Sequence, residues 1–465
     1  RDQGRQPLTK GVPIMQIIVV GCGKVGRSII SQLAQENNNV TVIDTDATII
    51  RNISTSYDVM GIVGNGASFN ILAKADLEHT DMLIAVTESD EVNLLTCVIA
   101  KLNNSQCHTI ARVRSPHYSD ERHYLQKGLN LSMTINPEME AAKEISRLLN
   151  FPSAIEIVSF AKDRIDMLRF RVPASSVLIG RSLKDIADLT VNLLVCIIER
   201  NSNILVPDGN TVIQEGDILT IIAMPRDAQA FFKKIGVRTN KCKSVMIVGG
   251  GQLSYYLAKM LLKSHTDVTI IERDMARCEE LVEALPGATI DCGDGTEEEL
   301  LKEEHLESMD GFVACTGMDE VNAILSLYAL KHMGKKVVTK VNHVDFGDVI
   351  EGLQLDSIVN PKELTAQQIV QYVRAAGNSM ESNVETLYRL MNGRVEALEF
   401  LLDKESPIIG PKLAEMQIKK NVLIAGIVRE GKLIIPGGQD AFQVGDTVIV
   451  VTTNLGFHDI ENILA

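Results

Sequence analysis

The sequence predicts an α/β fold of two tandem Rossmann-like, parallel-sheet lobes, each followed by a small α+β lobe. The first observation behind this prediction is an internal repeat, because residues 16–46 align with residues 244–274 at a constant offset. The second is the alternation of short apolar strand patterns with helical patterns in each half. The third is a glycine-rich turn, GCGKVG at 21–26, which follows a strand pattern and opens a helix pattern.

The repeat extends over nearly the whole chain. Further matches join 63–68 with 292–297, 87–93 with 316–322, 135–140 with 359–364 and 180–222 with 410–451. Composition bias does not produce an ordered repeat of this length. We therefore interpret the chain as a unit of about 225 residues that was duplicated.

The first part of each unit reads as strands alternating with helices. In the first copy, strand patterns occur at 15–20, 40–44, 81–87 and 108–114. Helical patterns lie among them at 26–36 and 91–103. Because these strands are continuously apolar, we expect a parallel sheet with helices on both faces.

The second part of each unit has a different pattern. In the first copy, residues 156–172 read as one strand and residues 180–188 as a helix. Residues 193–224 read as several short antiparallel strands, separated by turn signals such as NSN and PDGN. This pattern predicts a small α+β lobe.

These elements set the expected domain boundaries. Residues 1–14 look unlike the rest, and we expect them to be a remnant of cloning outside the fold, because a strand begins at Met15. A short polar linker is expected at 237–243. The predicted lobes are 15–150 (first Rossmann), 151–236 (its small lobe), 243–385 (second Rossmann) and 386–465 (last small lobe).

Composition narrows the function classes. A formal net charge of −14 argues against nucleic-acid binding, but backbone N–H groups could still hold a small nucleotide. The eight cysteines are scattered without a CxxC pair, which favours reduced core thiols of a cytosolic protein over disulfides or a zinc site. No apolar run approaches the roughly 18 residues of a membrane span, so we expect a soluble protein that reaches a membrane only through a partner.

The GCGKVG turn carries the strongest functional prediction. Gly21 would form the tight turn, Gly23 would let a pyrophosphate approach the backbone, and Gly26 would let the helix pack on the strand. The helix N-terminus would offer N–H groups and a positive dipole end to the phosphates. The alternative is a tight turn without a ligand. The predicted binding turn consists of Gly21, Cys22, Gly23, Lys24, Val25 and Gly26.

An acidic residue follows where a ribose would lie. Asp44, with Thr45 beside it, ends the second strand. Its carboxylate could accept both hydroxyls of an adenosine ribose and would repel a 2′-phosphate, which favours NAD(H) over NADP(H). ATP and ADP carry the same ribose, so the residues alone do not separate these ligands.

Later strand ends should face the same crevice. Asn65 could contact the adenine and Thr87 a phosphate or sugar, while an arginine of the fifth strand could offset phosphate charge. The alternatives are a turn for Asn65, a helix N-cap for Thr87 and a solvated side chain for the arginine. The candidates at these ends are Asn65, Gly66, Thr87, Glu88 and Arg112.

The second copy, GGGQLS at 249–254, keeps most of this pattern. Gly249 and Gly251 retain the first two glycine roles, whereas Ser254 replaces the third glycine. We expect a preserved nucleotide-binding shape, and we leave its occupancy open. The candidates of this less certain site are Gly249, Gly251, Gln252, Leu253, Glu272, Arg273, Asp294, Thr316 and Lys340.

Catalytic residues are not visible. The histidines form no evident pair with a carboxylate, and YYLAK at 255–259 lies on the first helix after the turn, far from where a dehydrogenase Tyr–Lys pair belongs. DCGDGTEEE at 291–299 fails the spacing of a calcium loop. We therefore expect a protein that is not an enzyme and binds no metal. The alternatives are an NAD-dependent oxidoreductase and a nucleotide-sensing scaffold for another partner.

Several motifs together resemble a known family. GCGKVG after MQIIVV, then VIDTD, GNGAS, AVTESDEVN, ARVRSP and VPDGNTVIQEGDILTII, are similar to the TrkA family of tandem RCK (KTN) proteins. Members of this family are peripheral cytosolic subunits of bacterial and archaeal Trk potassium transport. The resemblance covers residues 15–465, and the tandem arrangement is part of it.

The resemblance implies further properties. It implies binding of NAD(H) and adenine nucleotides, assembly into a ring (a homo-tetramer is expected), and docking on a membrane potassium channel subunit at the inner face of the membrane. Family roles carry onto Gly21, Gly23, Gly26 and Asp44, and more loosely onto Asn65, Thr87 and Arg112. Ser254 departs from the family pattern. The hypothesis is a cytoplasmic regulatory subunit that gates its partner when nucleotide changes the ring.

Overall fold

The structure is a computed structural model that falls into two compact units. One unit comprises residues 1–140 and 361–382, and the other comprises 141–360 and 383–465. The expected cloning remnant lies almost wholly outside the described residues. The described residues are 14–35, 38–115, 118, 122–161, 164–187, 189, 192–201, 203–237, 240–342, 353, 355–378, 384–391, 393–402, 406–457 and 459–465.

The first unit contains a parallel six-stranded sheet of order β3-β2-β1-β4-β5-β6, which confirms the predicted Rossmann-like class. Its central strand pairs Ile17 with Val40 on one side and with Met82 on the other. The chain order reverses between β1 and β4, and ligands of such sheets bind at this switch point. The strands are β1 (Gln16–Val20), β2 (Asn39–Asp44), β3 (Met60–Val63), β4 (Met82–Ala85), β5 (His108–Arg112) and β6 (Met133–Ile135).

Helices cover both faces of this sheet, so the strands are apolar on both sides. Ile17 and Val19 belong to one core and Ile18 and Val20 to the other, because successive side chains point to opposite faces. The helices are α1 (Lys24–Gln35), α2 (Ala47–Ser56), α3 (Phe69–Lys74), α4 (Asp90–Asn103), α6 (Arg122–Gly128) and the start of α7 (Pro137–Asn150).

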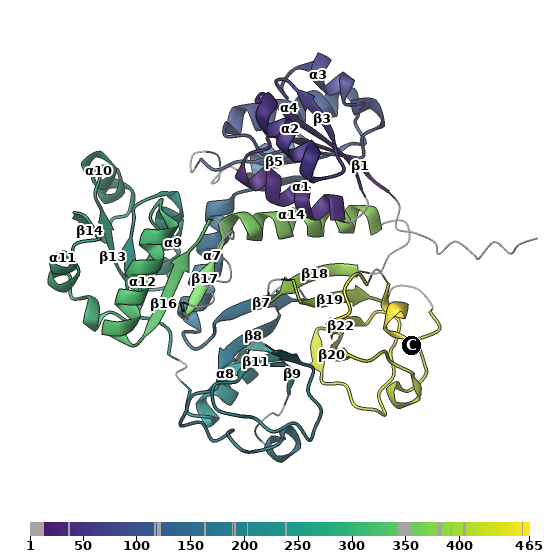
Figure 1. Cartoon of the computed structure of the whole chain (residues 1–465), viewed down its shortest axis with the longest axis vertical. Coiled ribbons are helices and arrows are strands. Elements are labelled where there is room, and N and C mark those ends of the chain that lie inside the picture. Colours follow the sequence, from purple (N-terminus) through teal and green to yellow (C-terminus); the bar gives the residue numbers. More distant parts are fainter. Residues whose placement is uncertain are drawn as a thin grey trace, which may run out of the picture. The chain divides into compact units, whose positions relative to one another are not determined.

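One helix of the first unit comes from the second repeat. α14 (Pro361–Asn378) lies along α1 (Figure 1) and buries Ile369 and Val373 in the same core as Ile17. Tyr372 of α14 hydrogen-bonds through its hydroxyl to Nδ1 of His108, at 3.0 Å. The first sheet is therefore completed by a helix that follows the second sheet in the sequence.

The second unit holds a sheet of the same topology, with order β14-β13-β12-β15-β16-β17. Its strands are β12 (Ser244–Val248), β13 (Asp267–Glu272), β14 (Thr289–Cys292), β15 (Gly311–Ala314), β16 (Lys336–Lys340) and β17 (Ser357–Val359). Its helices are α9 (Gln252–Lys263), α10 (Met275–Ala284), α11 (Glu298–Glu303) and α12 (Asp319–Met333).

Both small lobes also lie in the second unit, and each contains an antiparallel five-stranded sheet. The two sheets share a core in which Phe160 and Met167 of one lobe pack with Leu390 and Val451 of the other. The first sheet consists of β7 (Glu156–Phe160), β8 (Ile165–Arg171), β9 (Leu193–Arg200), β10 (Asn203–Leu205) and β11 (Ile218–Ala223), followed by α8 (Pro225–Lys234). The second consists of β18 (Val384–Leu390), β19 (Val395–Leu401), β20 (Val422–Arg429), β21 (Lys432–Ile434) and β22 (Thr447–Thr452).

Two predicted elements of the first small lobe were wrong in detail. Residues 156–172 form two antiparallel strands, because the chain reverses after Ala161, whose φ is 51°. In place of the helix predicted at 180–188, the described residues 180–187 form a 3-10 turn, Leu183–Ile186, and the hydroxyl of the preceding Ser182 donates to the Asp185 carboxylate. Local hydrogen bonds of Ser and Asp compete with a regular helix, so a single turn replaces it.

Within the described part of the chain, no helix is long and apolar enough to cross a membrane.

Candidate nucleotide-binding site

The glycine turn joins β1 to α1, and its three glycines have different surroundings. A Cβ on Gly21 would lie 2.7 Å from the backbone nitrogen of Thr87, and φ of Gly21 is +94°. A Cβ on Gly26 would lie 2.0 Å from the carbonyl oxygen of Gly21. Gly23 is exposed, and a Cβ there would meet nothing within 4 Å. Gly21 and Gly26 are therefore required by the fold itself, whereas the space over Gly23 is open at the N-terminus of α1.

Asp44 lies directly against this turn. Its Oδ2 accepts a hydrogen bond from the backbone N–H of Cys22 at 2.7 Å, and its Oδ1 accepts one from Asp46 at 3.0 Å. These bonds fix a half-buried carboxylate beside the glycine backbone, with Thr45 exposed next to it. A ribose diol would be held by accepting groups placed in this way.

Thr87 is held at the end of β4 by an asparagine that the sequence reasoning did not identify. Oδ1 of buried Asn93 accepts from the Thr87 N–H at 2.8 Å and from the Thr87 hydroxyl at 2.7 Å. Nδ2 of Asn93 donates to the carbonyl of Arg112 at 3.0 Å, so it ties the end of β4 to the end of β5. In the sequence, the one indication of a role for Asn93 was that the tripeptide EVN occurs in both copies of the repeat.

The alternative role of Thr87 as a helix cap is wrong. Ser89 caps α4, because its side chain accepts from the N–H of Val92 at 3.2 Å. Asn65 does make the turn that was considered for it, since its Oδ1 accepts from the N–H of Ala67 at 2.9 Å. A Cβ on the neighbouring Gly66 would lie 2.1 Å from Val20, so this glycine lets the turn pack over β1.

Arg112 is a cation with spare hydrogen-bonding capacity. Its Nε is buried and has no hydrogen-bond partner. Burial, and then the charge of Arg114, lowers the pKa of the Arg112 guanidinium. The Arg114 guanidinium, by contrast, donates a hydrogen bond to the backbone carbonyl of Glu88. Glu88 is an exposed residue. Oδ1 of Asp90 and Oε2 of Glu138 are also buried without hydrogen bonds. The negative charges of both carboxylates favour the charged guanidinium of Arg112 and so partly oppose the lowering of its pKa.

The structure thus places the predicted first-lobe residues along one edge of the sheet. The turn touches Thr87, Cys22 bonds Asp44, and the N–H of Gly64, one residue before Asn65, donates to the carbonyl of Asp44 at 2.8 Å. Arg112 joins the group through Asn93. Lys24 is exposed and Val25 is buried in the first turn of α1.

The second lobe repeats this geometry with a longer acid. Oε2 of Glu272 accepts from the N–H of Gly250 at 2.6 Å, and Oε1 accepts from Asp274 at 2.9 Å. A Cβ on Gly251 would again meet nothing within 4 Å. Ser254 is fully buried and its hydroxyl donates to the carbonyl of Gly249, so the helix accommodates a side chain where the first lobe has Gly26.

Two side chains of the second lobe, Lys340 and Asp294, use more of their hydrogen-bonding capacity within the protein than Arg112 and Asn65, their counterparts in the first lobe. Nζ of Lys340 donates to the carbonyl of Thr316 at 3.0 Å. Oδ1 of Asp294 accepts from both the N–H and the hydroxyl of Thr296, and these bonds lower its pKa. Thr316 pairs with Asn322 as Thr87 does with Asn93, at 2.7 Å. Gln252 and Arg273 are exposed, and Leu253 is buried.

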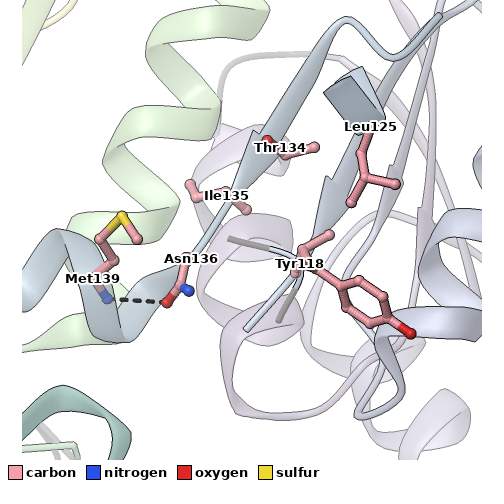
Figure 2. Close-up of a pocket in the computed structure, with 7 residues that line it drawn as sticks. Tyr118, Leu125, Thr134, Ile135, Asn136 and Met139 are labelled. Atoms are coloured by element: carbon pink, nitrogen blue, oxygen red, sulfur yellow. Dashed lines mark hydrogen bonds between the residues drawn. The ribbon is translucent and has the colours of Figure 1, made fainter. Parts of the chain in front are cut away.

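A separate small hollow lies at the end of β6 (Figure 2). Figure 2 shows Tyr118, Leu125 and Thr134 around it, with Oδ1 of Asn136 accepting from the N–H of Met139 at 3.0 Å. Its exposed lining is almost wholly apolar and includes none of the predicted site residues. Across the residues that the structure describes, no cluster of three His, Cys, Asp or Glu side chains could hold a metal ion.

Comparison with known families gives two matches, each found twice. The TrkA-N domain family matches residues 17–137 and 245–361. The TrkA-C domain family matches residues 167–236 and 397–465. The family matches thus alternate N, C, N, C along the chain.

Relatives match over nearly their whole length. The Trk system potassium uptake protein TrkA homolog 1 of Methanosarcina mazei is 31% identical over 96% of this chain and 99% of its own. The TrkA proteins of Halomonas elongata and Haemophilus influenzae are 30% and 29% identical, over 97% and 94% of this chain and 98% and 95% of theirs.

Solved structures share the fold. The GsuK channel bound to NAD superposes with a TM-score of 0.62, at 14% identity, over 97% of this chain and 78% of that one. The structure of GsuK bound to ADP gives a TM-score of 0.50 at 12% identity, over 79% of this chain and 72% of that one.

Proposed function

The chain belongs to the TrkA family of Trk potassium uptake proteins, and from this premise we propose that it is a regulatory, non-catalytic subunit. In this proposal it binds NAD(H) or ATP/ADP in the crevice of the first Rossmann lobe. The bound nucleotide changes the arrangement of the modules, and this change gates a membrane potassium channel or transporter subunit of the Trk type.

The observation that carries the proposal is the difference among the three glycines of the first turn. The fold needs Gly21 and Gly26 for its own packing, but no protein atom approaches the position of a Cβ on Gly23. A glycine at such a place is explained by a ligand that must come close to the backbone. The N–H groups at the start of α1 would then bind the pyrophosphate.

The remaining first-lobe residues fit the other parts of the nucleotide. Asp44 would accept the ribose hydroxyls, which favours NAD(H), ATP and ADP over NADP(H). The unpartnered Nε of Arg112 would gain an acceptor from a phosphate. Thr87 would face the phosphates or sugar, and Asn65 the adenine. The GsuK structures, one bound to NAD and one bound to ADP, support the same two ligand classes.

We propose that the second lobe binds nucleotide more weakly. Its turn and carboxylate keep the first-lobe geometry, which supports a site of the same kind. Lys340, however, already donates to a backbone carbonyl, so it offers less to a phosphate than Arg112 does. The candidate contacts are unchanged: Gly249, Gly251, Gln252, Leu253, Glu272, Arg273, Asp294, Thr316 and Lys340.

Gating requires that nucleotide bind one arrangement of the modules better than another. Such couplings are typically about 1–3 kcal/mol per site, so several sites acting together would make a usable switch. We propose a homo-tetrameric ring at the inner face of the membrane, held there by its channel partner. The boundaries given above for the four lobes serve as the working division of each subunit.

The experiment that tests this proposal is a titration of wild type, Gly23→Ala and Asp44→Ala with NADH, ATP and NADPH. We expect wild type to bind NADH or ATP, and both variants to bind at least tenfold more weakly. Equal binding by all three proteins would show that the site is misplaced. Steady turnover of NADH with a cytosolic metabolite would contradict the non-catalytic assignment.

A further inference from the structure

Two cysteines come together beside the acidic residue of the second lobe. Cys278 lies in the first turn of α10, and Cys292 is the last residue of β14. The strand register pairs Cys292 with Glu272 of β13. Sγ of Cys278 donates to the carbonyl oxygen of the same Glu272 at 3.2 Å. Cys292 thus lies beside Glu272 through strand pairing and Cys278 contacts the same residue through its thiol, and the two cysteine side chains interact with each other.

The two thiols differ in accessibility. Cys292 is exposed, whereas Cys278 is 5% exposed. The first lobe has no such pair, because the fourth residue of α2 is Ile50 and the last residue of β3 is Val63. Because an isoleucine and a valine occupy the equivalent positions in the first lobe, packing of the fold does not require cysteines at these two positions.

We propose that Cys278 and Cys292 form a thiol-exchange site that low-molecular-weight disulfides close into an intramolecular disulfide. The thiolate of Cys292 attacks one sulfur of the small disulfide RSSR, which forms a mixed disulfide and releases RS⁻. Cys278 then loses its proton to solvent and attacks the sulfur of Cys292, which releases the second RS⁻. Two protein thiols lose two electrons and two protons, and RSSR is reduced to two RSH.

The surroundings set the order of the two steps. Burial, and then the contact with Cys292, raises the pKa of the Cys278 thiol to about 12. Cys278 therefore stays protonated before Cys292 has formed its mixed disulfide. The exposed thiol reacts first, because small disulfides reach only accessible thiolates. The second step should quicken by about tenfold per pH unit below that pKa, since the thiolate is the attacking species.

Closing the disulfide would act on the neighbouring nucleotide site. The bond removes the hydrogen bond from Cys278 to the Glu272 carbonyl and draws the first turn of α10 toward β14. Glu272 also carries the carboxylate that bonds Gly250 in the glycine turn. We expect oxidation to weaken nucleotide binding in the second lobe by about fivefold or more, the low end of couplings between sites. This consequence rests on the function proposed above, whereas the disulfide itself does not.

The test uses the full chain, incubated with hydroxyethyl disulfide and mapped by mass spectrometry. We expect a Cys278–Cys292 peptide pair that has lost two hydrogen atoms and is reversed by dithiothreitol. Cys278→Ser should keep a mixed disulfide on Cys292, and Cys292→Ser should not react at this place. The buried pair Cys97 and Cys107 is the internal control and should stay reduced. A stable mixed disulfide on Cys292 in wild type, or no reaction, would overturn the proposal.

The effect on the second lobe is measured by titration with ADP in a Gly23→Ala background, before and after oxidation. Weaker ADP binding after oxidation, absent in the Cys278→Ser variant, supports the coupling. Unchanged ADP binding with the disulfide mapped would refute the coupling. If the second lobe binds no ADP in either state, the proposed second site fails, and the disulfide is judged by the mass map alone.

Discussion

Replacing Gly23 by alanine separates a ligand requirement from a folding requirement. The added methyl would meet no protein atom within 4 Å, and the backbone of Gly23 lies outside the left-handed region. Alanine should therefore leave the free energy of unfolding unchanged, or raise it by about 0.4–1 kcal/mol because the unfolded chain loses freedom. Gly26→Ala is the matched contrast, since its methyl would lie 2.0 Å from the carbonyl oxygen of Gly21. Overpacking of this kind costs about 1–3 kcal/mol.

The same methyl should block the ligand. It would occupy the space through which a pyrophosphate approaches the N–H groups of α1. A hydrogen bond to a charged group is worth about 1.5–3 kcal/mol, so losing one reduces affinity by roughly 10- to 150-fold.

The assay pairs urea unfolding with calorimetric titration of NADH and ATP for wild type, Gly23→Ala and Gly26→Ala. The expected pattern is a stable Gly23→Ala protein that binds poorly and a destabilised Gly26→Ala protein. Undiminished binding by Gly23→Ala, or destabilisation equal to that of Gly26→Ala, would show that Gly23 is not needed for a ligand.

Three further predictions follow from the structure. Asp44→Asn should weaken NADH binding more than NADPH binding in calorimetric titrations, because the repelling charge is removed; an unchanged ratio would contradict the ribose assignment. Arg112→Met should lower the affinity for ATP several-fold while Lys340→Met has little effect, since of these two residues Arg112 has a buried donor without a partner and Lys340 already donates to a carbonyl; equal losses would contradict this difference. Burial, opposed by Arg147, raises the pKa of Glu144 to about 7, so this carboxyl should make stability fall as pH rises from about 4.5 to 7. Urea unfolding of Glu144→Gln should show a flatter pH profile and greater stability at pH 8, by up to about 3 kcal/mol; identical profiles would refute the shift.

The parallel sheets could be predicted because their signals are local. Apolar strands such as 16–20 alternate with helices, and a glycine turn follows β1 in the first copy and β12 in the second. The roles of Gly21 and Gly26 also follow from spacing alone, since a βα turn leaves no room for their side chains.

Features that depend on distant contacts could not be predicted. Asn93 looks like an ordinary polar helix residue until β4 and β5 place Thr87 and Arg112 around it. The packing of α14 on α1 joins residues from opposite ends of the chain, and no periodicity reports such a pairing. Ser254 read as the loss of a packing glycine, but its hydroxyl replaces that contact with a hydrogen bond.

The strand reversal in the first small lobe and the proximity of the two cysteines could not be predicted from the sequence either. The charged residues Lys162, Asp163 and Arg164 follow Ala161 in the sequence, but the positive φ at this alanine has no sequence signal. Cys278 and Cys292 are 14 positions apart in the sequence and appeared as unrelated core thiols. The strand register brings Cys292 beside Glu272, and a hydrogen bond from α10 brings the Cys278 thiol to the same residue.

We propose that nucleotide in the first lobe controls a potassium-conducting partner. The most direct measurement is rubidium uptake into vesicles that contain the Trk membrane subunit, with wild type or Gly23→Ala added, in the presence and absence of nucleotide. We expect nucleotide to change uptake with wild type, and we expect Gly23→Ala still to bind the membrane subunit but to lose the nucleotide dependence. Uptake that responds equally to nucleotide with both proteins, or with neither, would contradict control of the partner by the first-lobe site.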